Sequence, residues 1–122
     1  TLRGLHYQAA PYVEAKLIRC TKGAIYDVII DIRKSSPTYM QWVGIKLTER
    51  NYKMLYVPEW FAHGYQTLQD NTEVIYQVSQ FYTPHAEQGI RWNDKAFNID
   101  WPGTEDRIVN EKDQSWPDYR AL

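Results

Sequence analysis

The sequence contains a single cysteine, Cys20, so its 122 residues offer no partner for an intrachain disulfide. Lys and Arg total 14 against 15 for Asp and Glu, and this balance gives no broad surface of one sign for nucleic acid or membrane. No apolar run approaches transmembrane length, and no charged-then-apolar signal segment opens the chain. These features predict a cytoplasmic protein that binds neither nucleic acid nor membrane, with Cys20 as a small buried side chain.

The length suffices for one hydrophobic core but not for separate cofactor and substrate domains, so residues 1–122 are expected to form a single domain. Apolar residues recur mostly with a period of two between turn-forming residues, which predicts strands and an all-β fold of the antiparallel barrel or sandwich type. Short helical turns are expected only at 48–51 and from Asn110 onward. About eight strands are expected, and those visible in the pattern span 2–8, 13–19, 24–33, 41–47, 53–57, 63–68 and 72–82.

Titratable side chains lie inside several of these apolar runs. His6 is a candidate base, and Lys16 places an ammonium where it must be buried or line a cavity. Tyr76 falls in an apolar row, where its hydroxyl needs a partner. Together the three predict one pocket that handles negative charge. Arg3, three positions before His6, falls on the opposite face, at the rim, unless Gly4 forms a bulge.

The residues alone leave other interpretations open. His6 also fits a hydrogen-bonded structural histidine, Lys16 a side chain lying along a sheet edge, and Tyr76 a core phenol. His63 fits a structural and a substrate-facing role equally well. His85 lies in an expected loop and is predicted to be solvated.

A series of motifs in order along the whole chain resembles the dTDP-4-dehydrorhamnose 3,5-epimerase family. These motifs are 1–8 (TLRGLHYQ), 15–19 (AKLIR), 27–33 (DVIIDIR), 36–38 (SPT), 42–44 (WVG), 57–65 (VPEWFAHGY), 89–92 (GIRW), 99–102 (IDWP) and 111–113 (EKD). The resemblance implies a cupin-like double-stranded β-helix, or jelly roll, with minor C-terminal helical turns. It also implies a homodimer without metal or organic cofactor.

The implied activity is inversion of C3 and C5 of a nucleotide-linked 4-keto-6-deoxy sugar through an enolate, as in conversion of dTDP-4-dehydro-6-deoxy-D-glucose to dTDP-4-dehydro-L-rhamnose. By match of motif, His6 is the base and Asp113 its orienting partner. Lys16 stabilises the enolate oxygen, and Tyr76 donates a proton from the opposite face. The resemblance further implies that the product serves deoxysugar supply for a surface polysaccharide or a glycosylated metabolite.

The resemblance also suggests substrate-binding residues. Arg3 matches a residue that contacts the diphosphate, and His63 matches one near the sugar. Tyr82 and Glu87 match positions near the mouth of the site. Thymidine diphosphate is the usual carrier in the family, while guanosine and cytidine diphosphates remain open. Trp60 stands where the family usually has glycine, which predicts strain at a positive φ and added bulk beside His63.

The family ordinarily carries a segment before the LRGLH motif that contributes to the nucleotide site and to dimer exchange. This chain begins inside a strand pattern, without a cap, a turn or an initiator Met, so we expect exposed sheet edges there. Three rival functions stay open: a single-centre epimerase or ketoisomerase on a related sugar nucleotide, a metal-dependent cupin oxygenase, and a non-catalytic carbohydrate-binding cupin. The oxygenase requires clustered ligands, whereas His6, His63 and His85 are widely separated in sequence.

Overall fold

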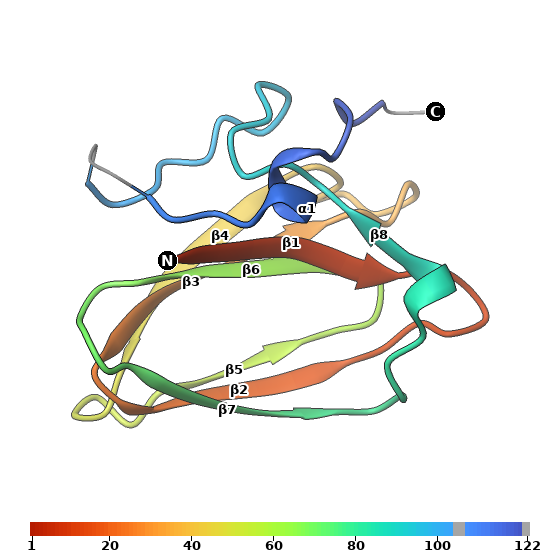
Figure 1. Cartoon of the computed structure of the whole chain (residues 1–122). Helices are drawn as coiled ribbons and strands as arrows, with labels where there is room; N and C mark the ends of the chain where they lie inside the picture. Colours follow the sequence, from red (N-terminus) through yellow and green to blue (C-terminus); the bar gives the residue numbers. More distant parts are fainter. Residues whose placement is uncertain (104–106, 121–122) are drawn as a thin grey trace.

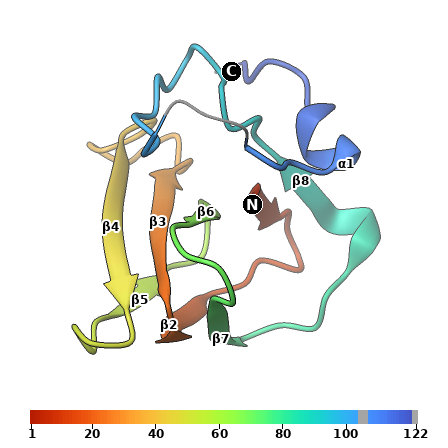
Figure 2. The ribbon, with the colours of Figure 1, turned by 60° about the vertical axis from the view of Figure 1, so that its left-hand side comes forward.

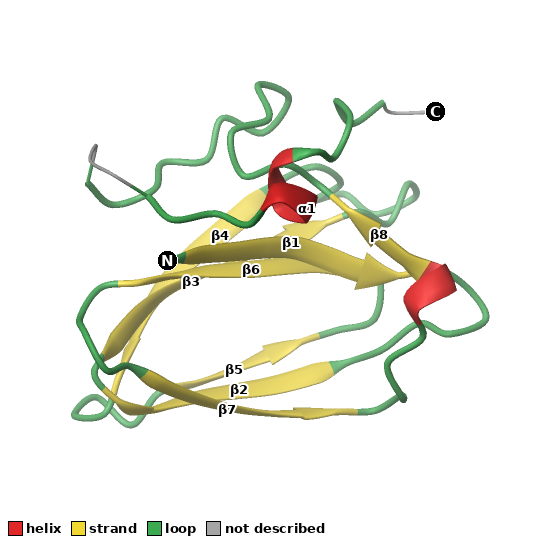
Figure 3. Cartoon of the chain, in the orientation of Figure 1, coloured by secondary structure: helices red, strands yellow, loops and turns green. Residues whose placement is uncertain are grey.

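The computed structural model describes residues 1–103 and 107–120, and these form an almost purely β structure (Figure 3). Two short helical segments accompany the strands, the 3-10 turn η1 (Pro84–Ala86) and the helix α1 (Glu111–Gln114). The strands of the described chain are β1 (Leu2–Gln8), β2 (Lys16–Lys22), β3 (Ala24–Asp31), β4 (Trp42–Thr48), β5 (Met54–Val57), β6 (Phe61–Thr67), β7 (Glu73–Val78) and β8 (Glu87–Gly89).

The strands form two antiparallel sheets that face each other (Figures 1 and 2). The five-stranded sheet has the order β4-β3-β6-β1-β8, and the three-stranded sheet has the order β5-β2-β7. Spatial neighbours such as β1 and β6 are distant in sequence, because the chain passes repeatedly from one sheet to the other. The predicted all-β, two-sheet architecture is confirmed.

Apolar side chains fill both sides of the five-stranded sheet. Between the sheets, Ile18 of β2 packs with Ile25 and Ile29 of β3. On the outer face, Leu5 and Val28 belong to a second cluster that the segment after β8 covers (Figure 1). β3 is therefore buried on both faces, which explains why its sequence is the most continuously apolar of the chain. Cys20 is buried in the cluster between the sheets, as predicted.

The expected helical turn at 48–51 is wrong. Thr48 still pairs with Ala24 at the end of β4, and its hydroxyl accepts hydrogen bonds from the backbone N–H groups of Arg50 and Asn51, which fixes a simple turn. The expected turn in the tail is confirmed as α1, whose first turn is capped by the side chain of Asn110.

The strand expected at 72–82 is shorter in the structure. β7 ends at Val78, opposite Lys16, the first residue of its partner strand β2. The pairing extends one step further through a backbone hydrogen bond from Ser79 N–H to the carbonyl of Ala15, and the strand ends there although the sequence continues to alternate as a strand would. Likewise β2 begins at Lys16, three residues later than the apolar run suggests.

Trp60, in the turn between β5 and β6, adopts the left-handed backbone region with φ of 64°. This agrees with the expected strain at that position. Its indole is 37% exposed and lies against Tyr7, with 6.5 Å between the ring centroids. Trp60 does not border the cavities described below.

We expect Trp60→Gly to be more stable than Trp60→Ala by about 1 kcal/mol. Both substitutions remove the packing on Tyr7, but only alanine retains a Cβ in the left-handed region. Urea unfolding of the two variants measures the difference directly. Equal stabilities would show that the turn relaxes to another backbone conformation.

Candidate active site

A bulge in β1 brings Arg3 and His6 to the same face of the five-stranded sheet. On β6 their partners Tyr65 and His63 are two positions apart, whereas Arg3 and His6 are three apart, so β1 contains one extra residue. The irregularity includes Gly4, whose φ of 109° is rarely open to residues with a Cβ. A Cβ there would lie 2.7 Å from the backbone of β6. The bulge considered from the sequence is therefore confirmed.

His6 is paired with the carboxylate of Asp113 from α1. Its Nε2 lies 2.5 Å from Asp113 Oδ1, and the backbone N–H of Gly4 donates to Oδ2 at 3.1 Å. Burial would raise the pKa of Asp113, but hydrogen bonds from His6, Gly4 and Trp116 outweigh it and hold the pKa below its usual value. Because a carboxylate only accepts, Nε2 carries a hydrogen, and in the neutral form of the ring Nδ1 is the nitrogen with the free lone pair.

The three-stranded sheet supplies Lys16 and Tyr76. In the β2–β7 ladder Lys16 is opposite Val78 and Ile18 is opposite Tyr76, so Lys16 and Tyr76 are diagonal neighbours on one face. Ile18 on that face packs in the cluster between the sheets, so this face is the one turned toward β1 and β6. The five-stranded sheet thus contributes Arg3 and His6 to the space between the sheets, and the three-stranded sheet contributes Lys16 and Tyr76.

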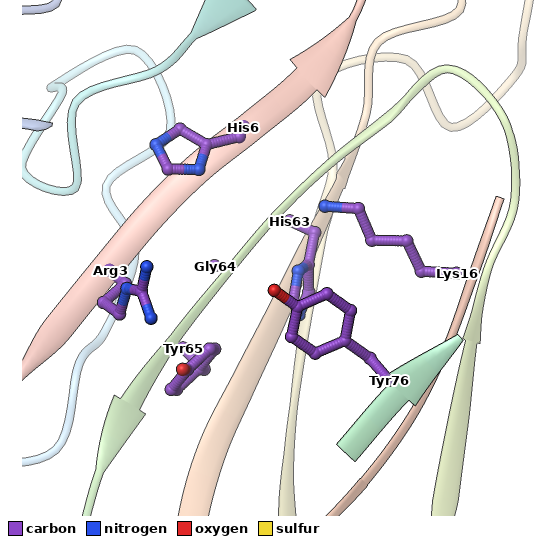
Figure 4. Close-up of a pocket in the computed structure, with 7 residues that line it drawn as sticks. All are labelled: Arg3, His6, Lys16, His63, Gly64, Tyr65 and Tyr76. Atoms are coloured by element: carbon purple, nitrogen blue, oxygen red, sulfur yellow. The ribbon is translucent and has the colours of Figure 1, made fainter. Parts of the chain in front are cut away.

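These side chains surround two adjoining cavities that share Arg3, His6, Lys16 and Tyr76. The smaller, of about 80 Å³, also borders His63, and the larger, of about 410 Å³, extends toward Asp113. Figure 4 shows the ends of the four shared side chains turned toward a common space, with a ring nitrogen of His6 facing it. Since Nε2 is bound to Asp113, the nitrogen available to a bound molecule is Nδ1. The larger volume falls in the range of small-molecule sites.

Lys16 is the buried cation of the site. Its side chain is 13% exposed, and its ammonium lies 3.7 Å from Glu14 Oε1. Burial lowers the pKa of Lys16, and the nearby carboxylates of Glu14, Asp27 and Glu87 offset part of that effect. An ammonium held in this way favours a neighbouring negative charge that develops during a reaction.

The model of the dTDP-4-dehydrorhamnose 3,5-epimerase family matches residues 1–121. The chain belongs to this family. It is 48% identical to the dTDP-4-dehydrorhamnose 3,5-epimerase of Shigella flexneri over 112 residues, which cover 92% of this chain and 61% of that protein. The chain thus spans about three fifths of the length of that curated relative.

Two solved structures of family members have the same fold. The enzyme from Bacillus anthracis, with TDP and PPi bound, gives a TM-score of 0.94 at 46% identity and covers 98% of this chain and 67% of its own. The Legionella pneumophila enzyme, in complex with dTDP-4-keto-L-rhamnose, gives 0.89 at 35% identity and covers 98% and 69%. The cupin-like fold implied by the family resemblance is thereby confirmed.

A second histidine–carboxylate pair was not found by the sequence analysis. His63 Nε2 lies 2.5 Å from Oδ1 of Asp27, which is fully buried on β3. Burial lowers the pKa of His63, and Asp27 only partly opposes this, so the ring is neutral and donates through Nε2. Asp27 Oδ2 has no hydrogen-bond partner among the described residues. The available signal was a carboxylate on the same strand face as Ile25 and Ile29.

Of the expected binding residues, Arg3 and His63 border the smaller cavity, whereas Tyr82 and Glu87 border the larger one. The Tyr82 hydroxyl donates to Glu87 Oε2 at 2.8 Å, and Lys112 donates to the same oxygen at 2.6 Å. The sequence analysis did not single out Lys112. All eight expected site residues therefore border these cavities, among them every member of the family's expected catalytic set.

His85 lies outside the site, as expected for a solvated histidine. It is exposed in η1, and its ring packs edge-on against Tyr12. Within residues 1–103 and 107–120, His, Cys, Asp and Glu side chains form no group of three or more arranged to hold a metal ion. No helix in this part of the chain has the length and apolar character needed to cross a membrane.

Proposed function

We propose that this chain inverts C3 and C5 of a nucleotide-linked 4-keto-6-deoxy sugar by proton abstraction and reprotonation through an enolate. The observation that carries the proposal is the placement of His6 and Tyr76 on opposing sheets, with both side chains turned toward one cavity (Figure 4). Inversion of a carbon centre needs a base on one face and an acid on the other.

His6 is the proposed base. Its Nδ1 takes the proton from the carbon beside the C4 ketone, while the C–H electrons form the enolate and leave negative charge on the C4 oxygen. Asp113 holds Nε2–H and stabilises the imidazolium that results. Lys16 faces the same cavity and stabilises the enolate oxygen.

Tyr76 is the proposed acid. Its phenolic O–H gives a proton to the opposite face of the carbanion carbon and the ketone re-forms. The phenolate then recovers a proton from solvent, and the imidazolium of His6 releases its proton to solvent, which regenerates both groups. Tyr76 is 54% exposed, so such recovery needs no buried relay. The reaction is a redistribution of protons with no net oxidation, and an organic cofactor has no part in the proposed steps.

The sugar nucleotide is the proposed substrate class. Arg3, beside His6, can make paired charge-assisted hydrogen bonds to a diphosphate, and the larger cavity suits a sugar ring. The ligands named for the Bacillus anthracis and Legionella pneumophila relatives favour thymidine diphosphate over guanosine or cytidine diphosphate as the carrier. We also infer a cytoplasmic homodimer from the family membership.

Incubation with dTDP-4-keto-6-deoxy-glucose in deuterated water tests the proposal. Deuterium uptake at C3 and C5, read by NMR together with formation of the inverted sugar, is the expected result. Uptake at one carbon alone would favour the single-centre epimerase. Binding without uptake at either carbon would favour the non-catalytic carbohydrate-binding cupin.

The rate of proton exchange should fall as the pH rises. This fall should occur at a lower pH than the pKa of an ordinary lysine side chain. Lys16 stabilises an enolate only as an ammonium, and burial lowers its pKa, so activity is lost as pH rises through that lowered value. Lys16→Arg keeps the cation at every accessible pH. A pH–rate profile should therefore show the alkaline loss in the parent protein and its absence in the arginine variant, even if the plateau rate is lower. An unchanged alkaline limb in Lys16→Arg would assign that limb to another group.

A further inference from the structure

Glu87 lies beside the His6–Asp113 pair without being hydrogen-bonded to it. β8 runs antiparallel to β1, with Gly89 opposite His6, and this places Glu87 next to the imidazole. Glu87 Oε1 lies 3.6 Å from His6 Nε2, the same nitrogen that donates to Asp113. The side chain of Glu87 is only 8% exposed, so its charge is poorly screened by solvent. The carboxylates of Asp113 and Glu87 thus both lie near the same nitrogen of the imidazole.

The other oxygen of Glu87 forms hydrogen bonds with two side chains that border the larger cavity. Oε2 accepts from Lys112 Nζ at 2.6 Å and from the Tyr82 hydroxyl at 2.8 Å. Burial would raise the pKa of Glu87, but the hydrogen bonds from Lys112 and Tyr82 outweigh it and hold the pKa below its usual value. Glu87 is therefore ionised wherever a histidine titrates, and it stands between an imidazole and an ammonium.

We propose that Glu87 is a positioning residue that, with Lys112, sets the charge balance around His6. Glu87 stabilises the imidazolium that forms when His6 takes a proton, and Lys112, bound to Glu87, offsets part of that stabilisation. The inference deepens the proposed function, since it assumes His6 as the base. A general base works best when its affinity for the proton is tuned near the working pH, and this pair of opposite charges provides the tuning.

The pair acts against a fixed background of charged and titratable groups. Besides Glu87 and Lys112, the charged and titratable groups that face His6 or border the same cavities are Arg3 and Tyr7 from β1, Glu14 from the segment before β2, Lys16 from β2, His63 and Tyr65 from β6, Tyr76 from β7, Tyr82 from the segment after β7 and Asp113 from α1. None of these residues is altered in the comparison of variants at Glu87 and Lys112. The two changes therefore isolate the contribution of this carboxylate and this ammonium.

The test uses NMR titration of the ring protons of His6 in the intact chain, which has only three histidines. In Glu87→Gln the titration midpoint of His6 should fall by about 0.5 to 1 pH unit, because one carboxylate beside the imidazolium is lost. In Lys112→Met the midpoint should rise by about 0.3 to 0.5 pH unit, because a nearby cation is lost. Opposite shifts are the signature of charge balance, since loosened packing would not reverse sign between the variants.

Glu111→Gln is the matched control, because it removes an exposed carboxylate from the residue next to Lys112 on α1. In this variant the titration midpoint of His6 should stay within about 0.2 pH unit of the parent value, because solvent screens the charge of an exposed carboxylate. The acidic limb of the exchange-rate profile should move with the midpoint in each variant. An unshifted midpoint in Glu87→Gln, or shifts of one sign in Glu87→Gln and Lys112→Met, would overturn the proposal.

The two proposals fail in different ways. If the midpoints shift as expected while the parent protein exchanges no sugar proton, the function assigned to the site is wrong but the charge balance around His6 stands. If the parent protein exchanges protons at C3 and C5 while the midpoints stay fixed, the epimerase stands and Glu87 has no positioning role.

Discussion

His6→Asn should lower the rate of deuterium uptake at C3 and C5 by about 10²- to 10⁴-fold, the usual contribution of a general base. The asparagine side chain offers an N–H near Asp113 Oδ1, but it has no lone pair basic enough to take a proton from carbon. The position is partly buried between β6 and β8, so a polar side chain of similar size is the least disruptive replacement. Binding of the substrate should change much less than turnover.

His85→Asn is the matched control for this loss. His85 is exposed in η1, packs its ring against Tyr12 and borders neither cavity, so its replacement should leave the exchange rate within about twofold of the parent. Thermal unfolding of both variants separates loss of chemistry from loss of folding. Normal exchange in a folded His6→Asn protein would remove His6 from the role of base.

The features of the sequence that predicted the fold are local ones. Strand patterns are visible in single segments such as 24–31, where burial on both faces leaves a continuous apolar run in place of alternation. Alternation sets Lys16 and Tyr76 on inward faces, because each strand obeys the period of two. Strand ends were less accurate, since β7 stops where its partner begins and the pattern of one segment does not contain its neighbour.

The candidate site was only partly accessible to sequence reasoning. The bulge in β1 could be named as a possibility from Gly4 but not assigned, because it depends on the close approach of β6 at Gly64. Asp113 lies 107 positions from His6, so motif matching alone suggested that the two would meet. Asp27 was overlooked because a carboxylate in a strand usually faces solvent, whereas here it faces the other sheet and binds His63.

Tyr76→Phe should separate proton exchange from inversion. His6 still removes the proton in this variant and can return a deuteron to the same face, so uptake should persist within about tenfold of the parent rate. Delivery from the opposite face needs the phenolic O–H, so formation of the inverted sugar should fall by about 10²- to 10⁴-fold. NMR of one incubation measures both quantities, deuterium content and product configuration.

The two sheets place the proposed base and acid on opposite sides of the cavity, since His6 lies on β1 and Tyr76 on β7. Phenylalanine keeps the ring against the β2–β7 face, and Tyr76 makes no hydrogen bond through its hydroxyl to the described residues that the change would break. Tyr52→Phe is a suitable control, because Tyr52 is 75% exposed and borders neither cavity. Equal loss of exchange and inversion in Tyr76→Phe would mean that the phenol also acts in proton removal or substrate binding. Unimpaired inversion would require a different acid on that face, and water entering beside the half-exposed Tyr76 would then be the proton source.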